Sequence, residues 1–353
     1  MNIPSWPPAA APRLPLVIAA VALALASLSM AAGADERRES ARFIYSPYKD
    51  VTLSLDSETH EIRSAVSGAV LPVVANGRSM LPAAVKVLTW AFAVGECGRE
   101  NWMGADAQKF AAANVPAFNA AGIGYIVSTG GQAGVFTCSS DAGMEAFIAR
   151  YASPRLLGID FDIEGEQTPA MIDSLVQRAV AAQRNHPQLR FSFTLATLAA
   201  SDGSRASVNA LGQSVLRAIR ARGLADYTIN LMVMDYGPVN PSNCVVANGV
   251  CDMGRSAIQA AENLNALHGV AFSRIELTPM IGVNDVPLND LTSESSRVIA
   301  RYARDKGLAG VRFWSLDRDQ PCPRPPSGAS PVCSGLQDVP ALGYSKALDP
   351  KQP

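Results

Sequence analysis

After the first 42 residues, strand-like and helix-like segments alternate regularly along the chain. Short runs of β-branched and aromatic residues are each followed by an alanine-rich stretch. We expect strands in eight such runs, at residues 43–48, 85–94, 124–129, 156–163, 190–196, 228–234, 275–281 and 310–315. Alternating strands and helices favour a parallel sheet with helices outside it. Eight units predict an α/β fold, a (β/α)8 TIM barrel, with an open doubly wound sheet as the alternative.

Two of the intervening segments carry clear helix signals. Apolar residues from Ile172 to Val180 follow the i, i+3, i+4, i+7, i+8 spacing of one helix face. Thr168 is placed to cap this helix, and Pro169 suits its first turn. A second helix is expected over residues 292–307, where a glycine ends it.

The overall composition is that of a globular protein, and we expect it to form one domain. Of the 353 residues, 48% are hydrophobic and 17% charged, which is too apolar for a disordered chain. The formal net charge is −1 and no Lys- or Arg-rich run occurs, so nucleic acid is not an expected partner. No linker divides residues 35–353, which we expect to form a single, monomeric barrel domain without a cofactor.

The N-terminal segment resembles a signal for export. Arg13 is the only charged residue before Asp35, and residues 14–28 are almost purely apolar. Residues 32–34 then form the small-x-small pattern at which signal peptidase cleaves. An uncleaved anchor is the alternative, but the apolar stretch is short for a membrane span. We therefore expect a signal peptide at residues 1–34 and a secreted protein, either extracellular or periplasmic, with no membrane attachment after cleavage.

Six cysteines suit an oxidising compartment. Fifteen pairings are possible in principle, but closeness in sequence favours two of them and leaves a third. The expected disulfides are Cys244–Cys251, Cys322–Cys333 and Cys97–Cys138. A zinc site is disfavoured because the three histidines, His60, His186 and His268, lie far apart between unrelated neighbours.

The most informative segment for chemistry is the acidic strand at residues 158–164. Because side chains alternate along a strand, Asp160, Asp162 and Glu164 project to one face and the intervening apolar residues to the other. In a barrel these acids point inward, with Glu164 at the carboxyl end where barrel enzymes place their chemistry. Acids about 6.5 Å apart repel each other, so at least one should stay protonated near neutral pH and could serve as a general acid.

The acidic strand also allows a solvated or a metal-binding role. The acids could form the solvated face of an antiparallel edge strand, but a parallel strand in a βα series has neither face in water. They could instead bind Ca²⁺ or Mg²⁺, which the pattern permits but favours less than acid chemistry.

Four segments together resemble glycoside hydrolase family 18, the chitinases and their relatives. The acidic strand is similar to the last three acidic places of the family's DGxDxDxE signature, with Leu157 where its first Asp stands. Residues 128–131 (STGG) resemble the SxGG of the third strand. Residues 232–237 (MVMDYG) resemble the Met-Asp-Tyr-Gly of a bacterial subgroup on the sixth strand, and Trp314 resembles the tryptophan that floors the sugar subsite.

The resemblance implies how each acid of the strand would act. The family cleaves β-1,4 links next to N-acetylglucosamine, and the substrate's own acetamido oxygen is the nucleophile. Glu164 would protonate the leaving oxygen and then activate water. Asp162 would hydrogen-bond the acetamido N–H and stabilise the positive charge, and Asp160 would tune Asp162 from below.

The remaining predicted site residues bind the substrate. By the same resemblance, Asp235 and Tyr236 would hold the acetamido group, and Met232, Met234 and Trp314 would contact the sugar. Trp102 is a further candidate sugar platform, although an ordinary buried tryptophan is an equally good interpretation.

These residues predict a secreted chitinase with a chitin-like, N-acetylglucosamine-containing partner. One alternative is a non-catalytic, lectin-like barrel that binds chitin or another glycan, against which the presence of Glu164 argues. Another is an endo-β-N-acetylglucosaminidase that acts on glycoprotein glycans with identical chemistry.

Overall fold

Eight parallel strands close into a barrel in the order β1-β18-β17-β14-β13-β12-β10-β6, which confirms the predicted fold class. The computed structural model describes residues 1, 43–324 and 326–352, so residues 2–34 of the predicted signal peptide lie outside the described residues. The barrel strands are β1 (Ile44–Asp50), β6 (Val87–Ala93), β10 (Gly124–Gly130), β12 (Leu156–Ile163), β13 (Arg190–Ala196), β14 (Thr228–Met232), β17 (Ile275–Thr278) and β18 (Gly310–Phe313). They match the eight predicted runs to within a few residues.

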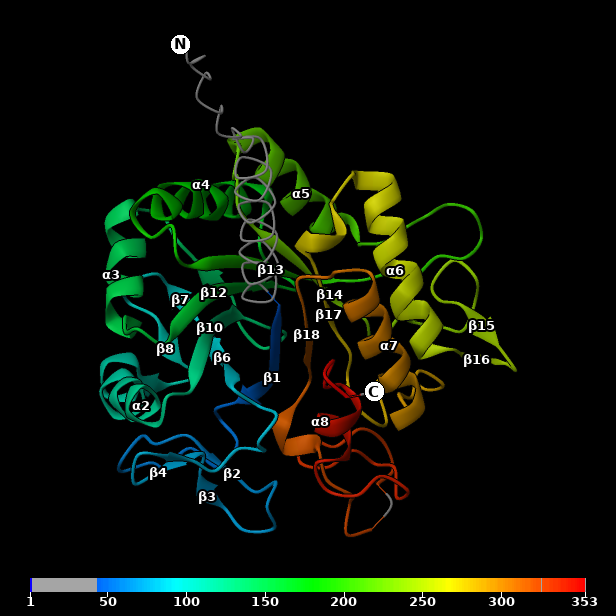
Figure 1. Cartoon of the computed structure of the whole chain (residues 1–353), viewed down its shortest axis with the longest axis horizontal. Helices are drawn as coiled ribbons and strands as arrows, with labels where there is room; N and C mark the ends of the chain where they lie inside the picture. The colour runs from blue at the N-terminus through cyan, green and yellow to red at the C-terminus, as the bar shows by residue number, and fades with distance from the viewer. Residues whose placement is uncertain (2–42, 325, 353) are drawn as a thin grey trace. The chain divides into compact units, whose positions relative to one another are not determined.

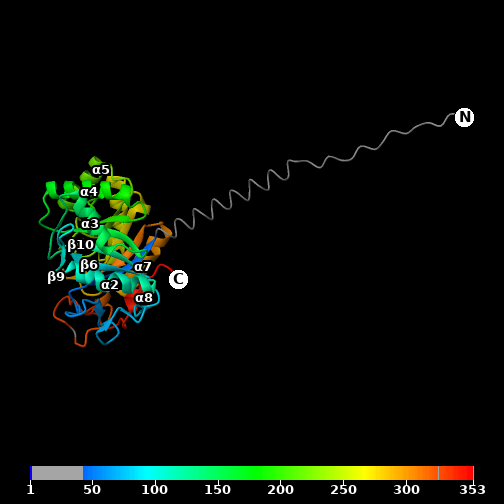
Figure 2. The same cartoon turned by 90° about the vertical axis from the view of Figure 1, so that its left-hand side faces the viewer.

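Helices follow most of these strands and surround the barrel (Figures 1 and 2). They are α2 (Ala107–Ala121), α3 (Asp141–Tyr151), α4 (Pro169–Asn185), α5 (Ala210–Arg222), α6 (Met253–His268), α7 (Ser293–Asp305) and α8 (Gly343–Ala347). Thr168 caps α4 through a bond from the Met171 N–H, as predicted. Thr292 likewise caps α7, which ends at Asp305, two residues before the predicted glycine.

The first crossover departs from the predicted alternation. Between β1 and β6, two short antiparallel hairpins stand where a helix was expected: β2 (Arg63–Ser64) with β3 (Leu71–Pro72), and β4 (Val74–Ala75) with β5 (Arg78–Ser79). Gly68 and Gly77 adopt positive φ in this segment, and prolines interrupt it. Both features disfavour a helix, because glycine is flexible and proline lacks the N–H donor.

Small elements complete the loops at the barrel ends. The two-stranded sheets there are β7 (Gly95–Glu96) with β11 (Phe136–Thr137), β8 (Asn101–Trp102) with β9 (Ala105–Asp106), and β15 (Val246–Ala247) with β16 (Val250–Cys251). Two 3₁₀ turns, η1 (Phe272–Arg274) and η2 (Leu316–Arg318), flank β17 and β18. All three predicted disulfides are present: Cys97–Cys138, Cys244–Cys251 and Cys322–Cys333.

The strand side chains divide between an apolar outer layer and a polar interior. Ile159, Phe161 and Ile163 of β12 are buried on the helix side, where the Phe161 ring packs against neighbouring phenylalanines. The barrel interior instead holds buried hydroxyl, amide and charged side chains, among them Asp160 and Arg312.

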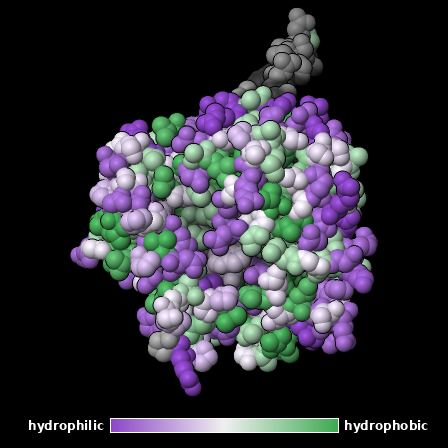
Figure 3. All heavy atoms as spheres, turned by 180° about the vertical axis from the view of Figure 1, so that it is seen from behind, coloured by the Kyte–Doolittle hydropathy of each residue, from purple (hydrophilic) through white to green (hydrophobic). Residues whose placement is uncertain are grey.

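The molecular surface seen from behind carries hydrophilic and hydrophobic residues side by side (Figure 3). Within the part of the chain that the structure describes, none of the helices combines the length and the apolar character needed to cross a membrane.

Candidate active site

A cavity of about 130 Å³ opens where the barrel strands end, and it brings most of the predicted site residues together. Because all eight strands are parallel, the residues at their carboxyl ends meet at one face of the barrel. The cavity is lined by Tyr48, Phe92, Gln132, Asp162, Glu164, Thr194, Met232, Met234, Asp235, Thr278, Met280, Asp285 and Trp314.

Asp160 lies beneath this cavity, fully buried in a dense set of donors. Its Oδ2 accepts from Tyr48 Oη at 2.8 Å and from Ser128 Oγ at 2.7 Å. Its Oδ1 accepts from the hydroxyls of Ser192 and Thr194 and lies 3.2 Å from Arg312 Nη1. Donors on both oxygens stabilise an ionised carboxylate in a place where a lone charge would be costly.

Asp162 lies two residues closer to the carboxyl end of β12 than Asp160, and its surroundings differ from those of Asp160. It is buried, and its Oδ1 has no hydrogen-bond partner among the described residues. Burial raises the pKa of Asp162 well above its ordinary value, and the nearby carboxyls of Glu164 and Asp160 raise it further. A buried carboxyl oxygen that faces a cavity without a partner is suited to accept a hydrogen bond from a bound molecule.

Asp160, Asp162 and Glu164 form a column of acids along β12, called the acidic column below, and Glu164 is half-buried at its carboxyl end. Burial raises the pKa of Glu164 to about 7, and the negative charge of Asp235 adds to this, while a hydrogen bond from the Gln132 backbone lowers it. A carboxyl with a pKa near neutrality can hold a proton and still give it up, as general acid–base catalysis requires.

The loop after β14 places Asp235 on the cavity wall and buries the neighbouring Tyr236. Asp235 has a positive φ of 45°, and its Oδ1 accepts from the Val286 backbone at 2.8 Å. Tyr236 is 3% exposed, is not among the cavity-lining residues, and its N–H donates to Asn289 Oδ1. The buried Tyr236 Oη has no hydrogen-bond partner among the described residues, and the contact of Tyr236 with the substrate stays a prediction. Tyr48, near the carboxyl end of β1, is the tyrosine that lines the cavity.

An aromatic pair forms another part of the cavity wall. The Trp314 and Phe92 rings stack with centroids 5.7 Å apart and planes at 15°, and both side chains are partly exposed. Met232 and Met234 also line the cavity, as predicted. A flat aromatic surface is suited to the apolar face of a ring-shaped ligand.

Trp102 is a core residue, which corrects its prediction as a sugar platform. It is 1% exposed, its ring stacks on Phe110, and its Nε1 donates to Tyr151 Oη at 2.9 Å. The buried-tryptophan interpretation therefore describes Trp102.

Several cavity residues were not predicted from the sequence. Tyr48 and Phe92 stand near the ends of the first two strands, and Asp285 lies in the loop after β17. An aromatic residue at the carboxyl end of a predicted strand was the available signal for the first two. Among the described residues, no group of three or more His, Cys, Asp or Glu side chains could hold a metal ion.

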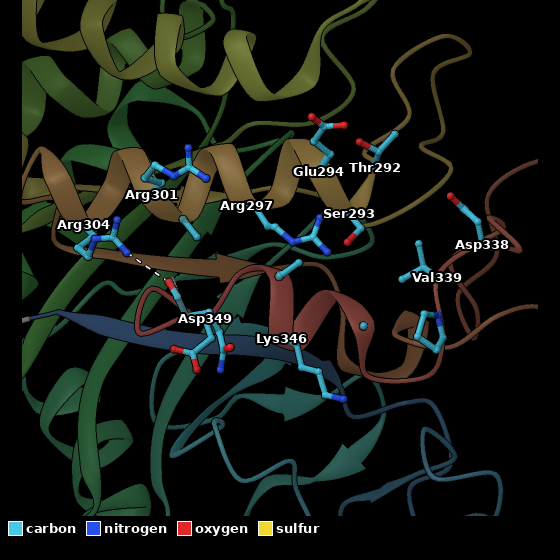
Figure 4. Close-up of a pocket in the computed structure, with 15 residues that line it drawn as sticks. Thr292, Ser293, Glu294, Arg297, Arg301, Arg304, Asp338, Val339, Lys346 and Asp349 are labelled. Carbon is cyan, nitrogen blue, oxygen red and sulfur yellow. Dashed lines mark hydrogen bonds between the residues drawn. The ribbon is translucent and has the colours of Figure 1, made fainter.

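A larger cavity of about 670 Å³ lies away from the acidic strand, against α7 and α8 (Figure 4). Arg297, Arg301, Arg304 and Lys346 line it together with Glu294, Asp338 and Asp349. None of the predicted site residues borders this groove, whose charges are of both signs.

Comparisons with known proteins agree with the motifs of the cavity. No family model matches the chain. The probable bifunctional chitinase/lysozyme of Escherichia coli K12 is 25% identical over an alignment of 339 positions, which covers 88% of this chain and 34% of that protein. Endochitinase 11 of Metarhizium anisopliae is 26% identical over an alignment of 188 positions, which covers 46% of this chain and 33% of that protein.

Solved structures show the same barrel. Active domain 2 of a thermostable chitinase from Pyrococcus furiosus superposes with a TM-score of 0.65 at 24% identity, over 87% of this chain and 93% of that one. The chain is similar to chitinases in both sequence and fold. It spans about one third of the length of the two curated relatives that it matches.

Proposed function

We propose that this chitinase-like chain is an exported glycosidase that cleaves β-1,4-linked N-acetylglucosamine polymers. The observation that carries the proposal is the pairing of Asp162, whose Oδ1 is buried without a partner, with Glu164, whose pKa burial raises to about 7. An acetamido N–H could donate to Asp162, while Glu164 holds the proton that a leaving glycosidic oxygen needs. The relative from Pyrococcus furiosus was crystallised with chito-oligosaccharides, which supports this substrate class.

The proposed reaction uses the substrate's acetamido oxygen as the nucleophile. Glu164 donates its proton to the glycosidic oxygen as the bond to the anomeric carbon breaks, and the acetamido oxygen forms a bond to that carbon. Asp162, as an anion, stabilises the resulting oxazolinium ring. Water, deprotonated by Glu164, then opens the ring and restores the β configuration. The stacked rings of Trp314 and Phe92 would support the sugar, and Asp235 would orient its acetamido group.

Export and domain extent belong to the same proposal. We propose that residues 1–34 are removed as a signal peptide and that residues 35–353 form the mature barrel protein. The three disulfides among the described residues support an oxidising destination, because such bonds persist outside the cytosol.

The function is tested with N-acetylchito-oligosaccharides and the variant Glu164→Gln. We expect the wild-type protein to release shorter oligosaccharides whose new ends first appear as the β anomer in proton NMR. Glu164→Gln keeps the size of the side chain but cannot donate the proton, so kcat should fall by about 10²–10⁴-fold or more.

Cello-oligosaccharides provide the matched control, since they lack the acetamido group and should remain uncut. Inversion at the anomeric centre, or equal cleavage of cello-oligosaccharides, would contradict the proposed mechanism. Failure of the wild-type protein to cleave any N-acetylated oligosaccharide would overturn the function itself.

A further inference from the structure

Four buried or partly buried charged side chains form a linked charge network in the barrel interior, beneath the cavity. Arg190 Nη1 lies 2.9 Å from Glu276 Oε1, and Arg312 Nη2 lies 2.6 Å from Glu276 Oε2. Arg312 Nη1 then lies 3.2 Å from Asp160 Oδ1. The two cations and two anions balance. The side chains of Asp160, Glu276 and Arg312 have no exposed surface.

Burying such a charge network in the barrel costs free energy of desolvation. Removing charges from water costs several kcal/mol per ion, and apolar residues of similar volume often stabilise a core equally well. This charge network ends at Asp160, the lowest of the three acids on β12. We therefore asked how its charges act on the other two acids, Asp162 and Glu164.

The carboxylate oxygens of Asp160 have many hydrogen-bond partners, and this distinguishes Asp160 from Asp162 and Glu164. Both of its oxygens already accept bonds from the four hydroxyls described above, and Arg312 neutralises its charge. Asp162 Oδ1, by contrast, is buried with no partner among the described residues.

We propose that Arg312 and Glu276 are positioning residues: Arg312 places its positive charge beside Asp160 and below Asp162, Glu276 holds the Arg312 guanidinium there, and together they set the pH range in which Asp162 and Glu164 share one proton. This inference rests on the proposed glycosidase function, in which the active form carries one proton on that pair. The positive charge of Arg312 acts on Asp162, and Glu276 weakens this effect because its negative charge pairs with the same guanidinium.

The groups that face Asp162 show why Arg312 is decisive. The titratable and charged ones are Tyr48 of β1, Asp160 and Glu164 on its own strand, Arg312 of β18, Asp235 after β14 and Asp285 after β17. The neighbouring strands β10 and β13 contribute the hydroxyls of Ser128, Ser192 and Thr194. Arg312 is the cation of this set, and it lowers the pKa of Asp162 while the acids raise it.

The test is the pH profile of kcat/KM on an N-acetylchito-oligosaccharide. Its acid limb reports the first ionisation of the Asp162–Glu164 pair, and its alkaline limb reports the second. Arg312→Gln removes the cation, so both limbs should move to higher pH, by about one unit. Glu276→Gln leaves Arg312 with Asp160 as its carboxylate partner, so both limbs should move to lower pH. Arg312→Lys keeps the charge and should leave the limbs near their wild-type positions.

Opposite shifts in the two glutamine variants support the proposal, because a merely structural role would lower activity at every pH. Unmoved limbs in both variants overturn it. If Arg312→Gln does not fold, the isosteric Glu276→Gln decides alone by the same criterion. A wild-type protein that cleaves nothing would reject the proposed function instead. The Asp162 titration, followed by carbon-13 NMR of the carboxyl without substrate, would then still test the proposal by the same shifts.

Discussion

Asp160, Asp162 and Glu164 share one strand but differ in what surrounds them. Asp160 is saturated with donors, Asp162 is buried with a free oxygen, and Glu164 reaches the cavity mouth. The sequence predicted that at least one of these acids stays protonated. Burial raises the pKa values of Asp162 and Glu164 in the structure, and nearby carboxyls raise them further (those of Glu164 and Asp160 for Asp162, and that of Asp235 for Glu164), in agreement with that expectation. Arg312, which sets Asp160 apart, lies on a distant strand and carried no sequence signal.

The raised pKa of Glu164 predicts a pH-dependent cost in stability. Its pKa rises from an ordinary 4.5 to about 7 on folding, so between these values the folded state binds more protons than the unfolded state. Stability therefore falls as pH rises through this window, and the cost is complete above it. Glu164→Gln removes this cost, so its gain in unfolding free energy should be larger at pH 8 than at pH 4, by about 1–3 kcal/mol.

Denaturant unfolding of both proteins at the two pH values measures this difference. Glu166→Gln, at an exposed position two residues along the chain, is the matched control for replacing a carboxylate by an amide. An equal difference at pH 4 and pH 8 for Glu164→Gln would contradict the assigned pKa shift.

At the scale of elements, the glycines of the third strand are needed for a close approach between β10 and β12. Gly130 has a φ of 85°, and a Cβ placed there would lie 2.1 Å from the Asp162 carbonyl oxygen. At Gly131, a Cβ would lie 2.7 Å from the Phe92 ring. The STGG motif therefore has a local steric reason beside its resemblance to SxGG.

Gly130→Ala should destabilise the protein and displace Asp162. Backbone strain and overpacking together should cost on the order of 3 kcal/mol, and hydrolysis should fall as the acidic strand shifts. Gly328→Ala is the matched control, because that exposed glycine has nothing within 4 Å of a built Cβ and no positive φ. Thermal unfolding of the two variants checks the prediction, and equal melting temperatures would refute it.

How far the elements could be predicted depended on the range of the interactions that form them. The strands of the barrel and the caps of α4 and α7 follow from local patterns, and they agree with the structure. The hairpins after β1 were missed because the helical alternation was extended across a segment interrupted by Gly68 and Gly77. The burial of Trp102 depends on its stacking on Phe110 and its bond to Tyr151, which local spacing does not encode.

For the whole molecule, the three disulfides crosslink loops outside the barrel strands, and they close chain segments of different lengths. Cys97–Cys138 connects the loop after β6 to the loop after β10, across a separation of 41 residues. Cys244–Cys251 and Cys322–Cys333 close separations of only 7 and 11 residues within single loops. In the chain-entropy description, a crosslink restricts the unfolded chain more when it closes a longer loop.

The disulfides should therefore contribute unequally to stability. Replacing both cysteines of the Cys97–Cys138 pair by alanine should lower the free energy of unfolding by about 4 kcal/mol, against about 2 kcal/mol for the Cys244–Cys251 pair. Denaturant unfolding of the two double variants gives both values, and thiol titration of denatured, unreduced protein should find no free cysteine. The Cys97–Cys138 variant should also lose more activity, because that bridge holds the loop after β10, whose Gln132 lines the cavity and bonds Glu164. An equal loss of stability in both variants would show that native-state contacts around each bridge, and not loop length, determine its contribution.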